Sequence, residues 1–258
     1  MSLLANLKGQ RALSLHSKGR TEEALPLYEA AYKAGMNQPR LLLAYATLLI
    51  RNGDYMPAKE LLVSTQKAPR ITPDQKSQLF MDYAVCCFKL GDINKGIRLL
   101  EKQHAHQPSG LIYETLGYLY AEKFDTANHQ SWTADIDQPD TADLDKALAF
   151  CLEAIDYDED DAIAWDNLGQ LYERAMHNRE KSLPCFQKAI ELKPGQIDTL
   201  WFLSRFDLEQ NLLSDAAEKL ETALDGRFSP LNVVSKDQMQ MELDRIRGLI
   251  ANGGHEHD

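Results

Sequence analysis

The chain has 258 residues and a formal net charge of −11, and it contains no run of about 18 apolar residues that would predict a membrane-spanning helix. Residues 1–5 show no basic stretch followed by an apolar core, which argues against a signal peptide, although an N-terminal anchor in a longer natural chain stays open. The four cysteines form no Cys-x-x-Cys pair and fit buried, reduced thiols, so we expect a cytoplasmic protein.

The charge is distributed unevenly along the sequence. Residues 1–108 carry 15 Lys and Arg against 9 Asp and Glu, a net charge of +6, whereas residues 109–258 carry 13 against 30, a net charge of −17. The overall acidity disfavours nucleic-acid binding, which needs a basic surface, and the basic half is too weakly charged to reverse this. We therefore expect no nucleic-acid partner.

Helical hairpins recur along the chain. In the first hairpin, Gly19 separates two stretches whose apolar residues have helical spacing. Similar hairpins are expected to start near residues 5, 39, 77, 110, 162 and 197. A last helix is expected over about 235–251, where Ser235 and Gln238 form a capping-box pattern, and residues 252–258 are expected to be a flexible tail.

The most regular repeat covers residues 162–194. Its first helix has the pattern W-x2-L-G-x2-Y, and its second has small residues around a Phe before a proline: Trp165, Leu168, Gly169, Tyr172, Ser182, Phe186, Ala189 and Pro194. This order resembles the tetratricopeptide repeat (TPR), with one extra residue before the second helix. The small Gly169 would let a neighbouring helix approach closely. The resemblance implies an all-α fold, a right-handed α-solenoid of antiparallel helix pairs, with about six repeats and a C-terminal capping helix in a single array over residues 1–251.

The fourth repeat departs from this regular spacing. An acidic insert is expected over about 125–141, between its two helices, and contains Trp132 and Ile136 among Asp135, Asp137 and Asp140. Insertions into repeats form loops on one face, often the binding face. Two roles stay open: the insert takes part in binding, or its two apolar side chains pack against a neighbouring helix.

The resemblance also implies a partner-binding groove. In TPR proteins the first helices of successive repeats line a concave groove. The matching positions here are Leu43, Thr47, Ile50, Met81, Val85, Phe88, Glu114, Tyr118, Asp166, Gln170, Glu173, Trp201 and Arg205. Several are apolar, as is typical of a contact surface, unless the superhelix or the C-terminal helix covers them. The groove is expected to change from basic to acidic along the array, which would orient a partner of mixed charge.

Other kinds of site fit the sequence less well. The clamp with which some TPR proteins hold the C-terminal carboxylate of chaperones needs Lys where Glu114 and Asp198 stand. The acidic run that begins at Asp156 lacks the Gly and the final Glu of a calcium-binding loop. No motif of a hydrolase, a nucleotide-binding loop or a zinc protease occurs. We therefore expect no catalytic residue, no metal and no cofactor.

The sequence thus predicts a non-enzymatic protein–protein interaction module, such as a scaffold, an adaptor or a co-chaperone-like protein. It would bind a partner peptide or helix, of unknown identity, in the groove. The main alternative is a self-assembling structural subunit, for example a homodimer, without a peptide ligand. A third hypothesis is an enzyme whose site lies in the acidic insert, with Trp132 and the neighbouring Asp residues.

Overall fold

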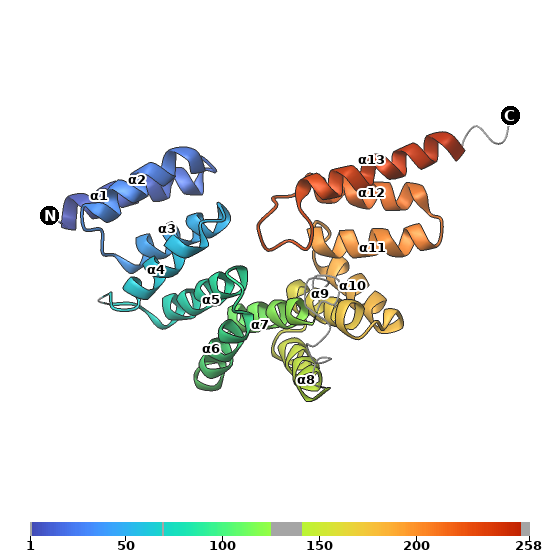
Figure 1. The fold of residues 1–258 in the computed structure, drawn as a ribbon, viewed down its shortest axis with the longest axis horizontal. Coiled ribbons are helices and arrows are strands. Elements are labelled where there is room, and N and C mark those ends of the chain that lie inside the picture. Colours follow the sequence, from blue (N-terminus) through green and yellow to red (C-terminus); the bar gives the residue numbers. More distant parts are fainter. Residues whose placement is uncertain (1, 69, 125–140, 254–258) are drawn as a thin grey trace. The chain divides into compact units, whose positions relative to one another are not determined.

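The computed structural model describes residues 2–68, 70–124 and 141–253, and these residues contain helices and their connections but no strand (Figure 1). They form 13 α-helices and one π-helical turn: α1 (Ser2–Ser17), α2 (Thr21–Lys33), α3 (Pro39–Arg51), α4 (Tyr55–Thr65), α5 (Pro73–Lys89), α6 (Ile93–His106), α7 (Gly110–Lys123), α8 (Thr141–Tyr157), α9 (Ala162–Gln170), the turn Leu171–Ala175, α10 (Arg179–Leu192), α11 (Ile197–Glu209), α12 (Leu213–Leu224) and α13 (Lys236–Gly253). The fold is an all-α helical repeat solenoid, which confirms the predicted fold class. Apart from Thr141, the predicted insert lies outside the described residues, as does the tail beyond Gly253.

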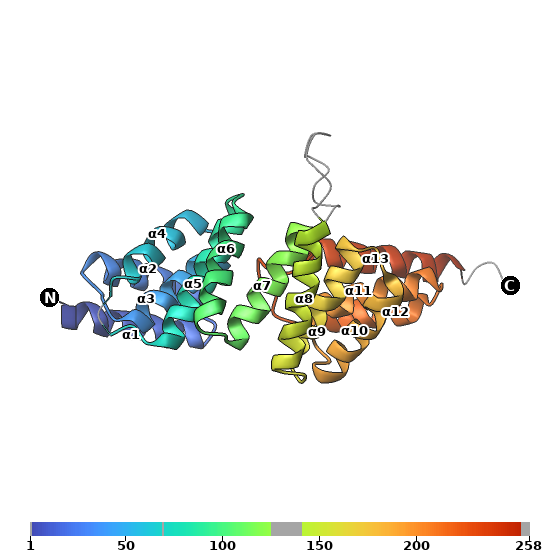
Figure 2. The ribbon, with the colours of Figure 1, turned by 90° about the horizontal axis from the view of Figure 1, so that it is seen from below.

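The described residues form two compact units, which divide within α7 between Leu119 and Tyr120. In the first unit, α1 packs on α2, α3 on α4, and α5 on α6. In the second unit, α9 packs on α10, α12 packs on α11 and α13 on α12; these last three helices lie side by side in Figure 1 and overlap in the view of Figure 2. An ion pair between Lys123 Nζ and Asp143 Oδ2, 2.7 Å apart, joins the end of α7 to α8. Both units are therefore built from helix pairs.

Capping boxes set the start of two helices. The amide of Gln75 donates to Oγ1 of Thr72 at 3.3 Å, and the amide of Thr72 donates to Oε1 of Gln75 at 3.1 Å. This exchange provides hydrogen-bond partners for amides at the start of the helix. The helix α5 therefore begins at Pro73, whereas the sequence pattern predicts a start near residue 77. Ser235 and Gln238 exchange the same two hydrogen bonds, at 2.9 and 3.2 Å, before α13.

A residue in the left-handed conformation follows the first helix of several pairs. Gly53 has φ 83° after α3, Gly91 has φ 85° after α5, and Asn211 has φ 58° after α11. Glycine adopts this conformation without a steric penalty, and asparagine tolerates it better than most residues do. These turns end the first helix sharply, so the second helix can pack back against it.

Gly169 allows the close contact of α9 with α10. A Cβ atom at this position would lie 2.7 Å from the ring of Phe186, too close for any real contact. Phe186 is fully buried, and its ring stacks on that of Phe202 of α11, with centroids 4.8 Å apart and an interplanar angle of 7°. The small residue of the repeat pattern thus lets one aromatic ring join three helices.

Candidate partner-binding site

Eight of the predicted site residues lie on α3, α5 and α7 in the first unit, and the structure divides them into two groups. Leu43, Ile50 and Val85 are only 1%, 6% and 3% exposed, so their side chains belong to the core. The other five are at least partly accessible, and we call them the first-helix face of the first unit: Thr47, Met81, Phe88, Glu114 and Tyr118.

Two aromatic residues meet on this face. The rings of Phe88, at the end of α5, and Tyr118, on α7, contact edge to face with centroids 5.8 Å apart and an interplanar angle of 77°. The Nζ atom of Lys89 lies 4.6 Å from the centroid of the Phe88 ring. An accessible aromatic pair beside a cation can hold an apolar side chain together with a neighbouring carboxylate.

A buried carboxylate connects α5 to Thr47 on α3. Oγ1 of Thr47 donates to Oδ2 of Asp82 at 3.4 Å and lies 3.4 Å from the Nε2 donor of Gln78. Asp82 is 5% exposed, and burial raises its pKa to about 7, although hydrogen bonding by Thr47 and Gln78 and the charge of Arg51 oppose the rise. Thr47 therefore takes part in the packing of α3 on α5 as well as in the accessible face.

In the second unit, two predicted residues lie in a buried hydrogen-bond network. Nε2 of Gln170 donates to Oδ2 of Asp166 at 2.7 Å, and Oγ1 of Thr199 on α11 donates to Oδ1 of Asp166 at 2.6 Å. Arg174 donates to Gln170 at 2.7 Å and to Oε1 of Glu122 on α7 at 2.9 Å. Asp166 and Gln170 are 4% and 1% exposed, and burial raises the pKa of Asp166. The network joins three first helices, α7, α9 and α11.

The π-helical turn Leu171–Ala175 directs Glu173 toward α10. The amide of Met176 donates to the carbonyl at the start of the turn, five residues back, at 3.2 Å. Such a turn accommodates one additional residue, which is the extra residue of this repeat. The carboxylate of Glu173 accepts hydrogen bonds from Nη1 of Arg179 at 2.5 Å and from Oγ of Ser182 at 2.6 Å. Both oxygen atoms of the Glu173 carboxylate are thus hydrogen-bonded within the repeat.

Trp201 and Arg205, both on α11, are at least partly accessible predicted residues of the second unit. The guanidinium carbon of Arg205 lies 5.6 Å from the centroid of the Trp201 ring, within the range of a cation–π contact. Nearby, Oδ1 of Asp198 accepts hydrogen bonds from the amide of Val233 at 3.0 Å and from the side chain of Asn232 at 3.1 Å. The loop before α13 therefore packs along α11. Trp201 packs in part against two buried clusters that Val233 and Val234 of this loop also contact, so the exposed Arg205 and the accessible part of Trp201 form the first-helix face of the second unit.

Comparisons with known proteins identify the repeats. Residues 17–103 match the family model described as anaphase-promoting complex, cyclosome, subunit 3, and residues 162–196 match the model of the tetratricopeptide repeat. No curated protein sequence matched the chain. A thermophilic TPR protein of Thermus thermophilus aligns over 81% of this chain and 98% of its own, with a TM-score of 0.63 and 17% identity. The chain contains tetratricopeptide repeats.

Two further solved structures resemble this TPR protein. MamA from Desulfovibrio magneticus aligns over 74% of this chain and 96% of its own, with a TM-score of 0.51 and 20% identity. Human IFIT1, in its dimer with PPP-AAAA, aligns over 89% of this chain and 51% of its own, with a TM-score of 0.62 and 16% identity. At such identities the likeness shows the fold alone.

The described part of this TPR protein contains neither a candidate membrane span nor a candidate metal site. None of its helices combines the length and the apolar character that crossing a membrane requires, and none of its His, Cys, Asp and Glu side chains form a group of three or more that could hold a metal ion. The four cysteines are free and buried, and burial raises the pKa of Cys86 and of Cys151 to about 12. Because the thiolate is the reactive form, these thiols act as packing residues.

Sequence positions alone did not indicate the role of Asp82 or of the pair Glu122 and Arg174. An Asp within a helix usually faces solvent, and nothing in the sequence around Asp82 indicates its burial. One feature of the sequence could have pointed to this ion pair. The repeat 162–194 has one extra residue, and the π-helical turn that accommodates this residue includes Arg174.

Proposed function

We propose that this TPR protein is a non-enzymatic interaction module, a scaffold, an adaptor or a co-chaperone-like protein, which binds a partner peptide or helix on its first-helix faces. The observation that carries the proposal is the accessible set of Met81, Phe88 and Tyr118 in the first unit. Large apolar side chains that stay accessible on a folded protein are typical of contact sites. The general role of TPR proteins in binding other proteins and peptides supports this assignment.

In this proposal the predicted site residues have two roles. The accessible ones contact the partner: Thr47, Met81, Phe88, Glu114, Tyr118, Trp201 and Arg205. The buried or internally bonded ones hold the first helices in place: Leu43, Ile50, Val85, Asp166, Gln170 and Glu173. Replacing a residue of the second group would therefore lower the stability of the fold before it affected any contact.

The charges beside the aromatic residues define the chemistry of the partner. Lys89 lies against Phe88, and Arg205 lies against Trp201, so each face presents an aromatic ring next to a cation. Glu114 adds a carboxylate to the first face. We expect a partner segment that carries apolar residues with acidic neighbours and at least one basic residue, because opposite charges favour the correct register.

Two substitutions test the proposal. A partner is first captured from a lysate of the organism of origin with the wild-type protein and identified, and its Kd is then measured by isothermal titration calorimetry. Phe88→Ala removes an aromatic contact, and Tyr118→Glu introduces a charge into the apolar face. Each is expected to weaken binding about tenfold or more, which corresponds to about 1.4 kcal/mol.

The matched control is Leu152→Ala, which removes an apolar side chain that is 45% exposed on α8, a helix that carries no residue of either first-helix face. It should leave the Kd unchanged. Circular dichroism and thermal unfolding should show that all three variants keep the helical content of the wild type. The assignment would be wrong if Phe88→Ala and Tyr118→Glu bound as tightly as the wild type, or if they lost binding only because they unfolded.

A further inference from the structure

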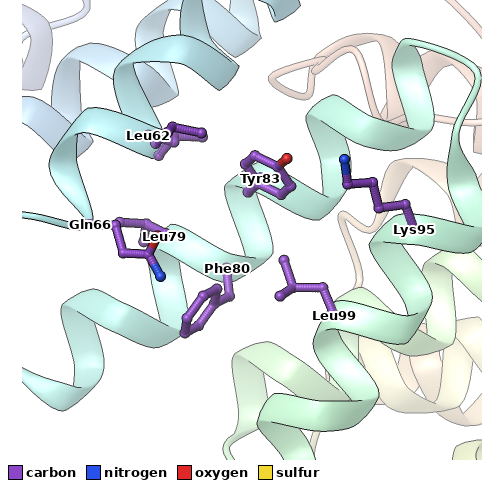
Figure 3. A pocket seen from close by; sticks show the side chains of 8 residues that line it. Leu62, Gln66, Leu79, Phe80, Tyr83, Lys95 and Leu99 are labelled. Carbon is purple, nitrogen blue, oxygen red and sulfur yellow. The ribbon is translucent and has the colours of Figure 1, made fainter.

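A hollow opens between α4, α5 and α6 in the first unit (Figure 3). Its volume is about 260 Å³, and its wall is mainly apolar. The buried side chains of Leu62 and Leu79 line it together with the partly exposed rings of Phe80 and Tyr83, and Leu99 closes it from α6. Apolar groups thus surround a space that no side chain of the described residues fills.

This hollow lies on a different side of α5 from the first-helix face. Tyr83 follows Met81 by two residues, which corresponds to a rotation of about 200° around the helix. The second helices α4 and α6 flank the hollow, whereas the first helices carry the face assigned above. A ligand of the hollow would therefore not compete directly with a partner bound at Phe88 and Tyr118.

The polar side chains that line the hollow are basic or neutral. Lys95 lines it across from Tyr83 in Figure 3, and the Nζ atom of Lys59 lies 5.6 Å from the centroid of the Tyr83 ring. Both lysines oppose the rise that burial causes in the pKa of Cys87, whereas the charge of Asp92 adds to it, so two cations and one carboxylate act on this side of α5. Among the residues that the structure describes, neither lysine forms an ion pair, and no lining residue is acidic.

We propose that this hollow is a second docking site, which accepts one large apolar side chain from an acidic segment of a partner protein. The space is smaller than the roughly 300–1,000 Å³ of typical small-molecule pockets, and it suits a single anchoring side chain. Carboxylates next to that anchor would pair with Lys59 and Lys95. The rim charges therefore select an acidic segment over a basic one.

The test uses peptides selected from a random phage-displayed library against the immobilised full-length protein. The enriched peptides are synthesised with a fluorescent label, and their Kd is measured by fluorescence polarisation. We expect enrichment of peptides in which Trp, Phe or Leu is flanked by Asp or Glu. Their binding should weaken as the salt concentration rises, because the rim lysines are accessible to solvent.

Variants locate the binding site of the enriched peptides. Leu99→Trp fills the hollow, and Lys95→Glu reverses the charge of a rim residue at an exposed position of α6. Each should weaken binding at least tenfold. Lys8→Glu, which makes the same charge change at an exposed position of α1, should not. Phe88→Ala should leave peptide binding unchanged as well, so this site and the proposed first-helix contact can fail independently.

Three outcomes would overturn the inference. The first is that no acidic, apolar-anchored peptide is enriched, and the second is that the enriched peptides bind Lys95→Glu and Leu99→Trp as tightly as the wild type. The third is a concentration-dependent dimer in light scattering that Lys95→Glu abolishes, because the occupant would then be a second copy of this chain. Circular dichroism of each variant checks that the fold is intact.

Discussion

Two carboxylates, Asp82 in the first unit and Asp198 in the second, form hydrogen bonds between one element and the next. Burial raises the pKa of each to about 7, from an ordinary value of 3.8. Asp82 is bonded to Thr47 of the neighbouring first helix, and Asp198 is bonded to the loop before α13. Ionisation of either carboxylate should therefore change the stability of the contact that it makes.

The pH dependence of stability follows from these raised pKa values. Below about pH 3, Asp82 is protonated in both the folded and the unfolded chain, and its contribution to stability is fully present. As the pH rises from about 4 to about 7, the unfolded chain loses this proton first, so the free energy of unfolding falls by up to about 1.4 kcal/mol per pH unit. Asp82→Asn should reduce this fall and make the protein more stable than the wild type above pH 7.

Urea denaturation at several pH values between 4 and 8 measures this effect. Asp198→Asn serves as a parallel variant, because the amide oxygen can still accept the hydrogen bonds of Val233 and Asn232. Each variant should reduce the slope, and the double variant should reduce it further. Identical pH profiles for the wild type and Asp82→Asn would contradict the burial of an ionisable group at this position.

At the scale of elements, the sequence predicts where the helix pairs lie better than it predicts which of their side chains are accessible. The W-x2-L-G-x2-Y pattern, Gly169 and the Ser235 capping box each depend on local spacing, and the structure contains the close contact and the hydrogen bonds that they imply. Whether a groove position is accessible depends instead on the neighbouring helix. Asp166 stands at such a position, yet it is buried, and its Oδ1 atom accepts a hydrogen bond from Oγ1 of Thr199 on α11 at 2.6 Å.

The π-helical turn gives the second unit its buried ion pair. Side chains of Arg174 and Glu122 are 6% and 8% exposed, so Arg174→Ala leaves a buried carboxylate without its main cation. We expect this variant to lower the free energy of unfolding by about 3–5 kcal/mol. The double variant Glu122→Ala, Arg174→Ala should lose less than the sum of the two single variants, because it leaves no unpaired charge.

The matched control for this prediction is Arg245→Ala on α13. Arg245 pairs with Glu242 at 2.7 Å, but its side chain is 53% exposed, so its loss should cost less than about 1 kcal/mol. Guanidinium chloride denaturation of all four variants compares the two pairs. Equal losses for Arg174→Ala and Arg245→Ala would show that the pair on the π-helical turn is not buried in solution.

At the scale of the whole molecule, repeats of one kind carry different surfaces. The packing residues of the repeat 162–194 are those of its family and say little about the ligand. What is particular to this chain lies elsewhere: the aromatic pair Phe88 and Tyr118, the Trp201 and Arg205 contact, and the basic hollow around Tyr83. Each belongs to one unit, so each can be altered without changing the other unit.

Site-specific photo-crosslinking tests the central claim, that partners bind at the first-helix faces. The photoreactive residue p-benzoyl-phenylalanine replaces Tyr118 in one variant and the exposed Leu152 of α8 in another, and both are irradiated in cells of the organism of origin. We predict a covalent adduct with a different protein from position 118 and none from position 152. Adducts only from position 152, or only with a second copy of this chain, would contradict the claim.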